Sequence, residues 1–535
     1  MKVLRNIIST QNINVILGVG FIFRLLAVFF ARGFGMHDDH YLVIEAGQSF
    51  ADGEDYNNWL PWHSDGLPTG HSWFYVGIHF IIFKILNICG VADPQMKMIV
   101  IRFIHAGYSL LTVYWSYRIM QKLSGEKVAL QTAWLLSLLW FIPNASVRNL
   151  VEWVCLPPLV VSIYQLVMAE QENDSRRRYI LSGIFSGISM GIRLQVVFFI
   201  AGIGLYLLLR KKILPGIIWL AGFISALMFT QLTDLFFYGY PFAEVGGYIE
   251  YNILHSTDYF NLPWYNYLLT IGGMLIPPVS LLLMFGYLRG GRKYLILVLP
   301  ALTFFVIHSY FPNKQERFIL PFIPFFIMAG LAGWEDFKSN GRLLKWERGV
   351  WVFFWTINTP ALLVLSTTYS KRSMVEGMYY LYQQQDFNSY IFEVSHKDDP
   401  MMAPQFYSGK WNHPYCIYKQ YTVGQMMESM KAKGGELPRY ILFFQEDDIY
   451  RRVAAFKIKT GLDLVYRYTA EPSYFDRLLH WLNPRNKNNP IFIFRIYDRN
   501  NVLSSVSASG ANQLKTDLMV LNTINVRSGG NSGNF

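Results

Sequence analysis

The sequence predicts an α-helical polytopic membrane protein with an α/β domain at its C-terminal end. Hydrophobic residues make up 52% of the 535 residues and charged residues only 16%, whereas soluble domains carry about 25% charged residues. Apolar runs of about 17–25 residues, the length that crosses a bilayer core, recur through roughly the first 370 residues. We therefore expect lipid to cover most of the apolar surface of this chain.

About eleven of these runs are candidate membrane-spanning helices. They cover residues 13–31, 99–117, 128–143, 152–169, 179–194, 195–209, 213–232, 266–287, 294–309, 318–334 and 349–367. A further run at 73–89 is apolar enough to span, so its placement decides on which side of the membrane every later loop lies.

Clusters of basic residues between the runs set the orientation, because loops rich in Lys and Arg stay in the cytoplasm. Six clusters should share that side: Lys2/Arg5, Arg118/Lys122/Lys127, Arg176–Arg178, Arg210–Lys212, Arg289/Arg292/Lys293 and Lys338/Arg342/Lys345/Arg348. If 73–89 crossed the membrane, all clusters after it would lie outside. We therefore predict that 73–89 lies in or dips into the outer leaflet without crossing.

This topology divides the chain into a transmembrane domain at 1–369, a soluble α/β domain at 370–523 and a disordered Gly/Ser/Asn-rich tail at 524–535. The soluble domain should be extracytoplasmic, as should four loops of the transmembrane domain. These loops cover 32–98, 144–151, 233–265 and 310–317. Short strand-like segments predict the sheet of the soluble domain. They are Tyr390–Val394, Tyr440–Phe444 and Ile491–Tyr497.

The charge balance does not indicate a nucleic-acid partner. Lys and Arg number 47 against 36 Asp and Glu, but the excess lies in short clusters between apolar runs, as in membrane proteins. The three cysteines, Cys89, Cys155 and Cys416, are too few and too scattered for a disulfide framework or a metal site. We predict no cofactor and no cysteine-bound metal.

The first extracytoplasmic loop begins with the sequence His37-Asp38-Asp39-His40-Tyr41, directly after the first span. Two carboxylates between two histidines at the membrane surface could supply a general base or hold a divalent cation. A solvated helix start explains the same residues equally well, since ionisable groups are common at membrane edges.

The second loop carries Asn149 and places Glu152 at the lip of a span, beside the interfacial residue Trp153. A surface loop with an aromatic anchor accounts for these residues without any ligand. Arg193 lies at the outer end of a long apolar run. Its guanidinium either extends to the lipid headgroups or faces a polar cavity that holds an anion.

The third loop contains Asp234, Tyr238, Asn252 and Trp264. An aromatic belt at a helix start explains much of this composition. Aromatic rings and amides also suit a sugar-binding cleft, because rings pack on C–H surfaces while amides bond hydroxyls.

The last short loop reads Asn313-Lys314-Gln315-Glu316-Arg317. Two cations on an outer loop oppose the positive-inside trend. A structural ion pair with Glu316 is one explanation. We favour a phosphate-bearing lipid headgroup as the reason, because Arg offers a forked donor to phosphate oxygens and Lys a point charge.

Together these motifs resemble, in family order across about residues 15–335, the GT-C-type mannosyltransferases that use dolichyl-phosphate mannose to build GPI anchors and N-glycan precursors. The resemblance is carried by His37-Asp38-Asp39-His40-Tyr41, Asn149-Leu-Val-Glu152, Asp234-Leu-Phe-Phe-Tyr238-Gly239, Asn252, Pro263-Trp264-Tyr265 and Asn313-Lys314-Gln315-Glu316-Arg317-Phe318.

The sequence departs from the family pattern at two motifs. The usual His-Pro-Asp-Glu motif keeps its Asp as Asp39, but Asp38 replaces Pro and His40 replaces Glu. The usual His-Lys-Glu-x-Arg-Phe motif keeps Lys314, Arg317 and Phe318, while Asn313 and Gln315 replace His and Glu. These departures leave the sugar and the acceptor open, and a divergent or bacterial member fits them.

The resemblance implies an inverting transfer of a hexose, most simply mannose, from a polyprenyl or dolichyl phosphate to a hydroxyl of a glycan or glycolipid. Asp39, or failing it Asp38, would be the general base, and Lys314, Arg317 and Arg193 would bind the donor phosphate. The remaining motif residues would bind substrate: His37, His40, Asn149, Glu152, Asp234, Tyr238, Asn252, Trp264, Asn313 and Gln315.

A transporter or flippase of lipid-linked sugars is the alternative function. Transporters tend to carry internal repeats and charged or broken helices at the bilayer midplane, and no repeat is evident in this sequence. The polar residues gather instead on one predicted face, which favours an enzyme. No ER-retention signal is visible, so we expect a bacterial inner membrane rather than the ER membrane.

Overall fold

The computed structural model describes residues 12–63, 72–172, 175–258, 261–339, 346–394, 402–411, 414–417, 422–433, 436–484 and 489–497. The tail predicted to be disordered, 524–535, lies outside these residues, as do the basic residues Lys2, Arg5, Arg342 and Lys345. The chain forms two compact units, Met1–Thr368 and Tyr369–Phe535.

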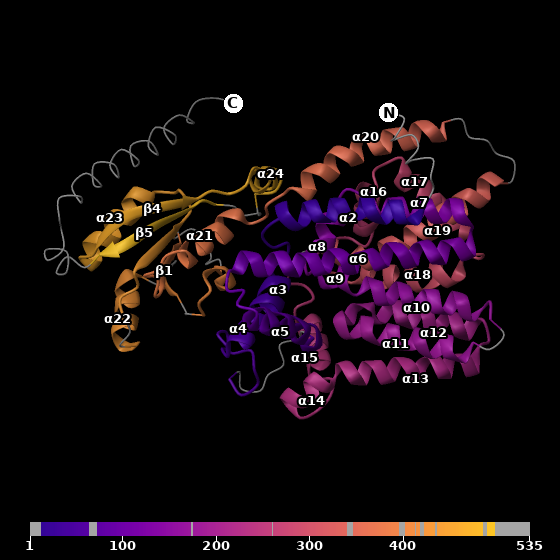
Figure 1. Cartoon of the computed structure of the whole chain (residues 1–535), viewed down its shortest axis with the longest axis horizontal. Helices are drawn as coiled ribbons and strands as arrows, with labels where there is room; N and C mark the ends of the chain where they lie inside the picture. The colour runs from indigo at the N-terminus through magenta and orange to yellow at the C-terminus, as the bar shows by residue number, and fades with distance from the viewer. Residues whose placement is uncertain are drawn as a thin grey trace. The chain divides into compact units, whose positions relative to one another are not determined.

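The described residues of the first unit form helices joined by short turns, with one isolated β-bridge between Asn261 and Asn313 (Figure 1). Its longer helices are α2 (Ile13–Phe30), α5 (Trp73–Ile88), α6 (Pro94–Leu123), α7 (Glu126–Leu138), α10 (Leu156–Ala169), α11 (Arg176–Ile192), α12 (Val197–Leu209), α13 (Ile213–Thr230), α15 (Ala243–Leu254), α17 (Val279–Gly290), α18 (Leu295–Tyr310), α19 (Ile323–Ser339) and α20 (Glu347–Ser366). Short segments connect them: α3 (His37–Asp39), η1 (His40–Glu45), α4 (Ala46–Asp52), α8 (Ile142–Val147), α9 (Val151–Val154), η2 (Leu194–Val196), α14 (Leu232–Tyr238), α16 (Asn266–Met274) and η3 (Glu316–Phe322).

Every apolar run that the sequence predicts as a span is helical, which confirms the helical membrane fold. Six helices or continuous helical stretches among the described residues are long and apolar enough to cross a bilayer: Ile13–Phe30, Pro94–Leu123, Val151–Ala169, Ile213–Tyr238, Glu316–Lys338 and Glu347–Ser366. The pair α17 and α18, bent by 115°, adds a seventh if it is counted as one span. This number is smaller than the predicted eleven because the remaining runs fold as shorter or broken helices.

Two of the predicted spans contain a break that hydropathy does not reveal. The run at 128–143 ends its helix at Leu138, where Asn358 of α20 donates to the Leu138 carbonyl and accepts from the amide of Trp140. The run at 266–287 is interrupted between α16 and α17, ahead of Pro278. Side chains of neighbouring helices can satisfy the backbone groups that such a break leaves free.

Arg24 in α2 stabilises the same end of α7. Its guanidinium is fully buried and donates to the carbonyls of Leu136 and Ser137 at 3.4 and 3.1 Å, and to the Ser109 hydroxyl at 2.8 Å. The last carbonyls of a helix have no partner within the helix, and a cation is favourable there. Arg24 therefore holds α7 at the point where the chain leaves it toward α8 and α9.

Close helix packing depends on glycines where α11 meets α13. A Cβ added to Gly183 would lie 2.0 Å from the carbonyl oxygen of Trp219, and one added to Gly222 would lie 2.3 Å from that of Ile180. Small residues let helix backbones approach in lipid, where the hydrophobic effect does not drive helices together. The contact continues to Gly191, where an added Cβ would lie 2.4 Å from Thr230, so α11 packs on α13 up to the residues just before Arg193.

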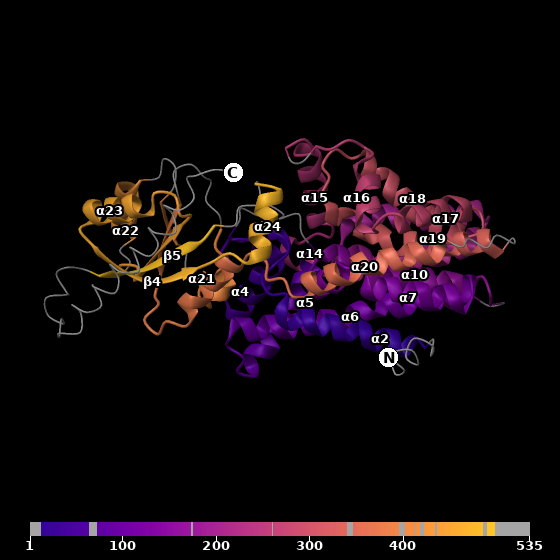
Figure 2. The same ribbon diagram turned by 90° about the horizontal axis from the view of Figure 1, so that it is seen from above.

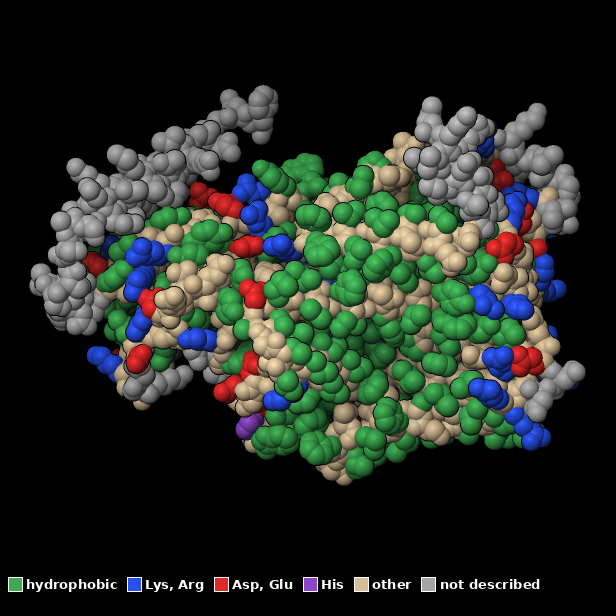
Figure 3. Space-filling view, in the orientation of Figure 1, with side chains coloured by type: hydrophobic (Ala, Val, Ile, Leu, Met, Phe, Trp, Pro, Cys, Tyr) green, Lys and Arg blue, Asp and Glu red, His purple; other side chains and the backbone are tan. Residues whose placement is uncertain are grey.

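Basic residues from separate loops meet at one end of the helical unit. Lys127 pairs with Glu335 at 2.6 Å, and Lys293 pairs with Asp336 at 2.8 Å. The space-filling view shows Lys and Arg side chains gathered at that end, beyond a broad hydrophobic surface (Figure 3). Three of the clusters predicted to share one side of the membrane, those of Lys127, Lys293 and Lys338, are thus joined around the end of α19.

The second unit contains a five-stranded sheet in the order β2-β1-β3-β5-β4. Figures 1 and 2 show its strands β4 and β5. Strands β1, β3 and β5 run over the three segments that the sequence predicts, and β2 and β4 were not predicted. The unit comprises α21 (Arg372–Tyr382), β1 (Tyr390–Val394), η4 (Gln405–Ser408), β2 (Tyr415–Ile417), α22 (Val423–Lys433), β3 (Tyr440–Phe444), α23 (Ile449–Thr460), β4 (Asp463–Ala470), α24 (Tyr474–Leu482) and β5 (Ile491–Tyr497).

The sheet is mixed, since β1 pairs in parallel with β2 and β3 while β5 is antiparallel to β3 and β4. One face packs on α22 and α23 around Met426, Phe443, Phe456 and Phe494. The central strand β3 is apolar and buried on both faces, as expected for a strand covered on two sides. The predicted α/β character of this region is confirmed.

Candidate active site

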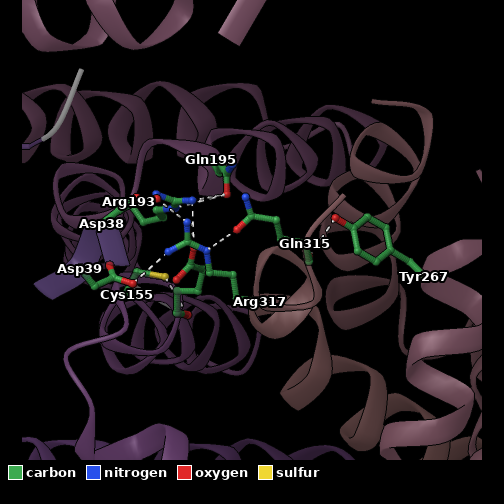
Figure 4. Close-up of polar contacts among 9 residues, drawn as sticks. Asp38, Asp39, Cys155, Arg193, Gln195, Tyr267, Gln315 and Arg317 are labelled. Atoms are coloured by element: carbon green, nitrogen blue, oxygen red, sulfur yellow. Dashed lines mark hydrogen bonds and ion pairs between the residues drawn. The ribbon is translucent and has the colours of Figure 1, made fainter. Parts of the chain in front are cut away.

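Arg317 joins the first and the last of the predicted extracytoplasmic loops. Its Nη2 donates to Asp38 Oδ2 at 2.7 Å and its Nη1 to Asp39 Oδ2 at 3.0 Å (Figure 4). The two aspartates come from α3, and Arg317 comes from η3 at the start of the α19 span. The first and the last of the sequence motifs therefore meet in space.

A second arginine and a buried glutamate extend this cluster. Arg193 Nη2 lies 2.9 Å from Glu152 Oε1, and Arg317 Nε lies 3.7 Å from the same oxygen. Both guanidinium carbons lie over the ring of Phe318, at 5.5 Å for Arg193 and 5.3 Å for Arg317. Glu152 is fully buried, so the two arginines compensate a charge that water cannot reach.

The loop around Asp39 is held firmly, whereas Asp38 faces solvent. Asn149 donates its amide to the Asp39 backbone carbonyl, and His40 is buried against the ring of Phe34 at 4.5 Å. The chain then continues as a π-helical turn, a conformation frequent at functional sites. As a result, the Asp39 side chain is 6% exposed and that of Asp38 is 49% exposed.

The surroundings of Asp39 raise the pKa of its carboxyl to about 7. Burial is the largest cause, and the negative charge of Glu152 adds to it, while Arg317 and Arg193 act in the opposite direction. A carboxylate with this pKa holds a proton more readily than an ordinary aspartate and still loses it near neutral pH. Asp39 is therefore suited to take up a proton during a reaction.

The cluster forms part of the lining of a cleft that is open to solvent. Asp38, Asp39, Arg193 and Arg317 belong to this lining. Other lining residues come from α5, α13, α14 and α15: Tyr75, Leu227, Gln231, Asp234, Glu244, Val245 and Tyr248. The cleft thus brings together residues from four predicted motifs and several that were not predicted.

Glu244 is the main acidic residue that the sequence motifs did not include. Its backbone N–H donates to Asp234 Oδ2 at 3.0 Å. Its carboxylate accepts hydrogen bonds from Trp73 Nε1 at 2.7 Å and from the Tyr238 hydroxyl. Glu244 follows Gly239 by five residues and lies in the first turn of α15. A carboxylate is stabilised at the N-terminus of a helix, and this position is the sequence signal that could have indicated Glu244.

Tyr75 reaches the cleft from α5, the run predicted to lie along the outer leaflet. Its hydroxyl lies 2.8 Å from His105 Nε2, and His105 Nδ1 lies 2.8 Å from the carbonyl of Ile101. Nδ1 must carry a proton to bond that carbonyl, so in the neutral imidazole Nε2 accepts and the tyrosine donates. The Tyr75 oxygen consequently has lone pairs left for a ligand, and no sequence motif indicated it.

Several predicted binding residues lie away from the cleft wall. Lys314 is buried and donates to the Phe311 carbonyl at 2.6 Å. Asn252 bonds the carbonyl of Tyr248 in its own helix, and Trp264 is exposed. The buried oxygen Asn313 Oδ1 has no hydrogen-bond partner among the described residues.

Two further predicted residues stand beside the cluster. Gln315 Oε1 accepts from Arg317 Nε at 2.9 Å, and its backbone carbonyl accepts from Tyr267 (Figure 4). His37 lies against the ring of Tyr41 at 4.1 Å. Within the described part of the chain, no three His, Cys, Asp or Glu side chains gather as a metal ion requires.

Residues 15–396 match the Alg9-like mannosyltransferase family. A relative from Yarrowia lipolytica named GPI mannosyltransferase 3 is 25% identical over 378 residues, which are 67% of this chain and 68% of the relative. A relative from Saccharomyces cerevisiae, named Dol-P-Man:Man(7)GlcNAc(2)-PP-Dol alpha-1,6-mannosyltransferase, is 31% identical over 214 residues, 36% of each chain.

Among solved structures, the apo form of ArnT from Cupriavidus metallidurans has a TM-score of 0.58 at 11% identity and covers 91% of this chain and 98% of its own. The structure of the same protein bound to undecaprenyl phosphate has a TM-score of 0.56 at 13% identity, with 90% and 97% covered. At this identity the likeness concerns the fold, and it confirms the predicted GT-C-type membrane architecture.

Proposed function

Since the chain belongs to the Alg9-like mannosyltransferase family and is a membrane-embedded glycosyltransferase, we propose that it transfers mannose from a polyprenyl or dolichyl phosphate. The acceptor would be a hydroxyl of a lipid-linked glycan. The observation that carries this proposal is the contact of Asp39 with Arg317 at the cleft. A base and a phosphate-binding cation are the two groups that such a transfer needs at one place.

In this mechanism Asp39 takes the proton of the acceptor hydroxyl while the oxygen attacks the anomeric carbon. The bond from that carbon to the carrier phosphate breaks on the opposite side, so the configuration inverts. Base catalysis contributes about 10²–10⁴-fold in enzymes. The raised pKa of Asp39, about 7, supports this role because the carboxylate is neither too weak a base nor permanently protonated at neutral pH.

The departing phosphate would bind the two arginines. Nη2 of Arg317 donates to the carboxylate of Asp38, which is half-exposed. A phosphate oxygen can therefore replace the Asp38 carboxylate as the acceptor, because the displaced carboxylate can be solvated by water. Arg193 would provide the second fork of donors from beside Glu152. Lys314 would contribute after its ammonium group leaves the Phe311 carbonyl, and we propose a smaller role for it.

Other residues that line the cleft suit the sugar. Asp234 and Glu244 are buried carboxylates, and the Tyr75 oxygen has lone pairs free. Carboxylate and phenol oxygens accept hydrogen bonds from sugar hydroxyls. We propose that these residues hold the mannosyl group while the two arginines hold its phosphate.

We propose that the reaction takes place on the extracytoplasmic face. Arg317 lies near the start of the stretch Glu316–Lys338, and the ion-paired Lys338 lies at its end, about 30 Å away at 1.5 Å per helical residue. The site and the basic clusters therefore occupy opposite ends of one span, and basic loops stay in the cytoplasm. A bacterial inner membrane remains our proposal over the ER membrane.

The test is a transfer assay with purified protein and a panel of polyprenyl-phosphate sugars, followed by mass spectrometry and NMR of the anomeric configuration. Asp39→Asn should lower turnover by about 10²–10⁴-fold. Asp38→Asn is the matched control, because it removes the neighbouring carboxylate and leaves Asp39 in place. Full turnover by Asp39→Asn, or movement of the intact lipid-linked sugar across the bilayer without transfer, would exclude this mechanism.

A further inference from the structure

Helix α24, Tyr474–Leu482, exposes a continuous apolar face in the second unit. Four large apolar side chains, at positions i, i+4, i+7 and i+8, form this face: Tyr474, Leu478, Trp481 and Leu482. Tyr474 is 91% exposed and Trp481 76% exposed. Single exposed apolar residues are ordinary on a protein surface, but a contiguous patch marks an interaction site.

The remaining residues of α24 show that the helix is well formed and packed against the second unit. Phe475 and Leu479 are half-buried, and Asp476 is buried. Ser473 and Asp476 form a reciprocal capping box at the helix start. The polar residues Arg477 and His480 lie on the solvent side, so the apolar, packed and polar faces are separate around the helix.

Asp476 ties α24 to the segment where the chain leaves its last apolar helix. Its Oδ1 accepts from the backbone N–H of Lys371 at 3.0 Å, and its Oδ2 from that of Arg372 at 3.1 Å. Lys371 follows Ser366, the end of α20, by five residues. Five extended residues reach at most about 17 Å, so the chain itself keeps this anchor close to the membrane boundary.

We propose that the exposed face of α24 inserts into the lipid headgroup region of the membrane that α20 spans. The composition fits that environment, since Trp and Tyr favour the interface and leucines bury their side chains in the acyl boundary. Arg372 is exposed at the same anchor, where its charge can contact lipid phosphates. Lipid thus covers the exposed face of α24, and the helix holds the second unit against the membrane surface.

The experiment uses the full-length protein in phosphatidylcholine nanodiscs with Cys89→Ser and Cys416→Ser, because Cys155 is buried and will not react. An NBD fluorophore is attached at Leu478→Cys or at Trp481→Cys. Trp481 is 76% exposed and Leu478 47% exposed, so both positions can react with the fluorophore. The control is Ile458→Cys on α23, an equally apolar residue that is 82% exposed. The other exposed large apolar residue of α23, Tyr450, is only 36% exposed and lies two turns away, so Ile458 is not part of a continuous apolar face.

We expect blue-shifted NBD emission at 478 and 481 and quenching by doxyl-labelled lipids that is several-fold stronger than at 458. Equal quenching at all three positions would overturn the proposal. A blue shift at 478 without quenching by lipid would also overturn it, because the face would then pack on protein, either another part of this chain or a second copy.

Discussion

Two buried arginines of the helical unit, Arg24 and Arg317, are held in opposite ways. Arg24 donates to the Ser109 hydroxyl and to backbone carbonyls at the end of α7, whereas Arg317 donates to the carboxylates of Asp38 and Asp39. Backbone carbonyls are fixed partners, but a half-exposed carboxylate can be replaced by another anion. The comparison indicates that partner type, and not burial alone, separates a structural arginine from one available to a substrate.

Among the arginine variants, the largest effect on turnover is expected at Arg317, the arginine with an exchangeable carboxylate partner. Arg317→Gln should lower kcat by about 10²–10³-fold, the usual cost of removing a preorganised group that stabilises developing charge. Turnover with saturating polyprenyl-phosphate mannose measures it. Arg317→Lys is the control, because it keeps the charge near Asp39 and loses the forked geometry. Near-normal turnover by the Gln variant would remove the distinction between the two arginines.

Arg193 should show the next largest effect. It would bind the departing phosphate from beside Glu152, and a hydrogen bond to a charged group contributes about 1.5–3 kcal/mol. Loss of that bond in Arg193→Gln should reduce kcat/KM by about 10–150-fold. Since Arg193 also lowers the pKa of Asp39, the acid limb of the activity profile should move to higher pH in this variant. An unchanged limb would show that Arg193 does not act on Asp39.

The pH profile of the unmodified enzyme is the third test. Asp39 works as a base only when deprotonated, and its pKa is raised to about 7. As the pH falls below this value, kcat/KM should fall about tenfold per pH unit. Asp38→Asn should keep this limb, because Asp39 remains. If the fall of kcat/KM at acidic pH disappeared in Asp38→Asn, Asp38 and not Asp39 would be the base.

The smallest effect on turnover is expected at Arg24. Arg24→Leu leaves the last carbonyls of α7 without this donor, so the thermal unfolding midpoint in detergent should fall, with a loss on the order of 1.5–3 kcal/mol. Turnover per folded molecule should stay within about threefold of the unmodified enzyme. The ratio of activity to folded protein, measured by size-exclusion chromatography, separates the two. A selective loss of kcat in well-folded protein would make Arg24 part of the catalytic machinery.

The sequence alone determined the class of this protein. Long apolar runs, basic turns between them and three short apolar segments after residue 370 specify membrane helices and strands, because hydropathy and periodicity are local properties. The motifs around Asp39 and Arg317 were visible for the same reason. They combine acidic and basic residues, whose placement at a membrane edge costs free energy unless the charges pair with one another.

Tertiary structure alone decided which of these residues meet and how. The breaks after Leu138 and before Pro278, the buried position of Glu152 between two arginines, and the places of Glu244 and Tyr75 on the cleft had little or no local signal. Each depends on which helices pack against one another. Hydropathy measures how readily a segment enters lipid, whereas the partners of a buried charge are set by contacts between segments far apart in the chain.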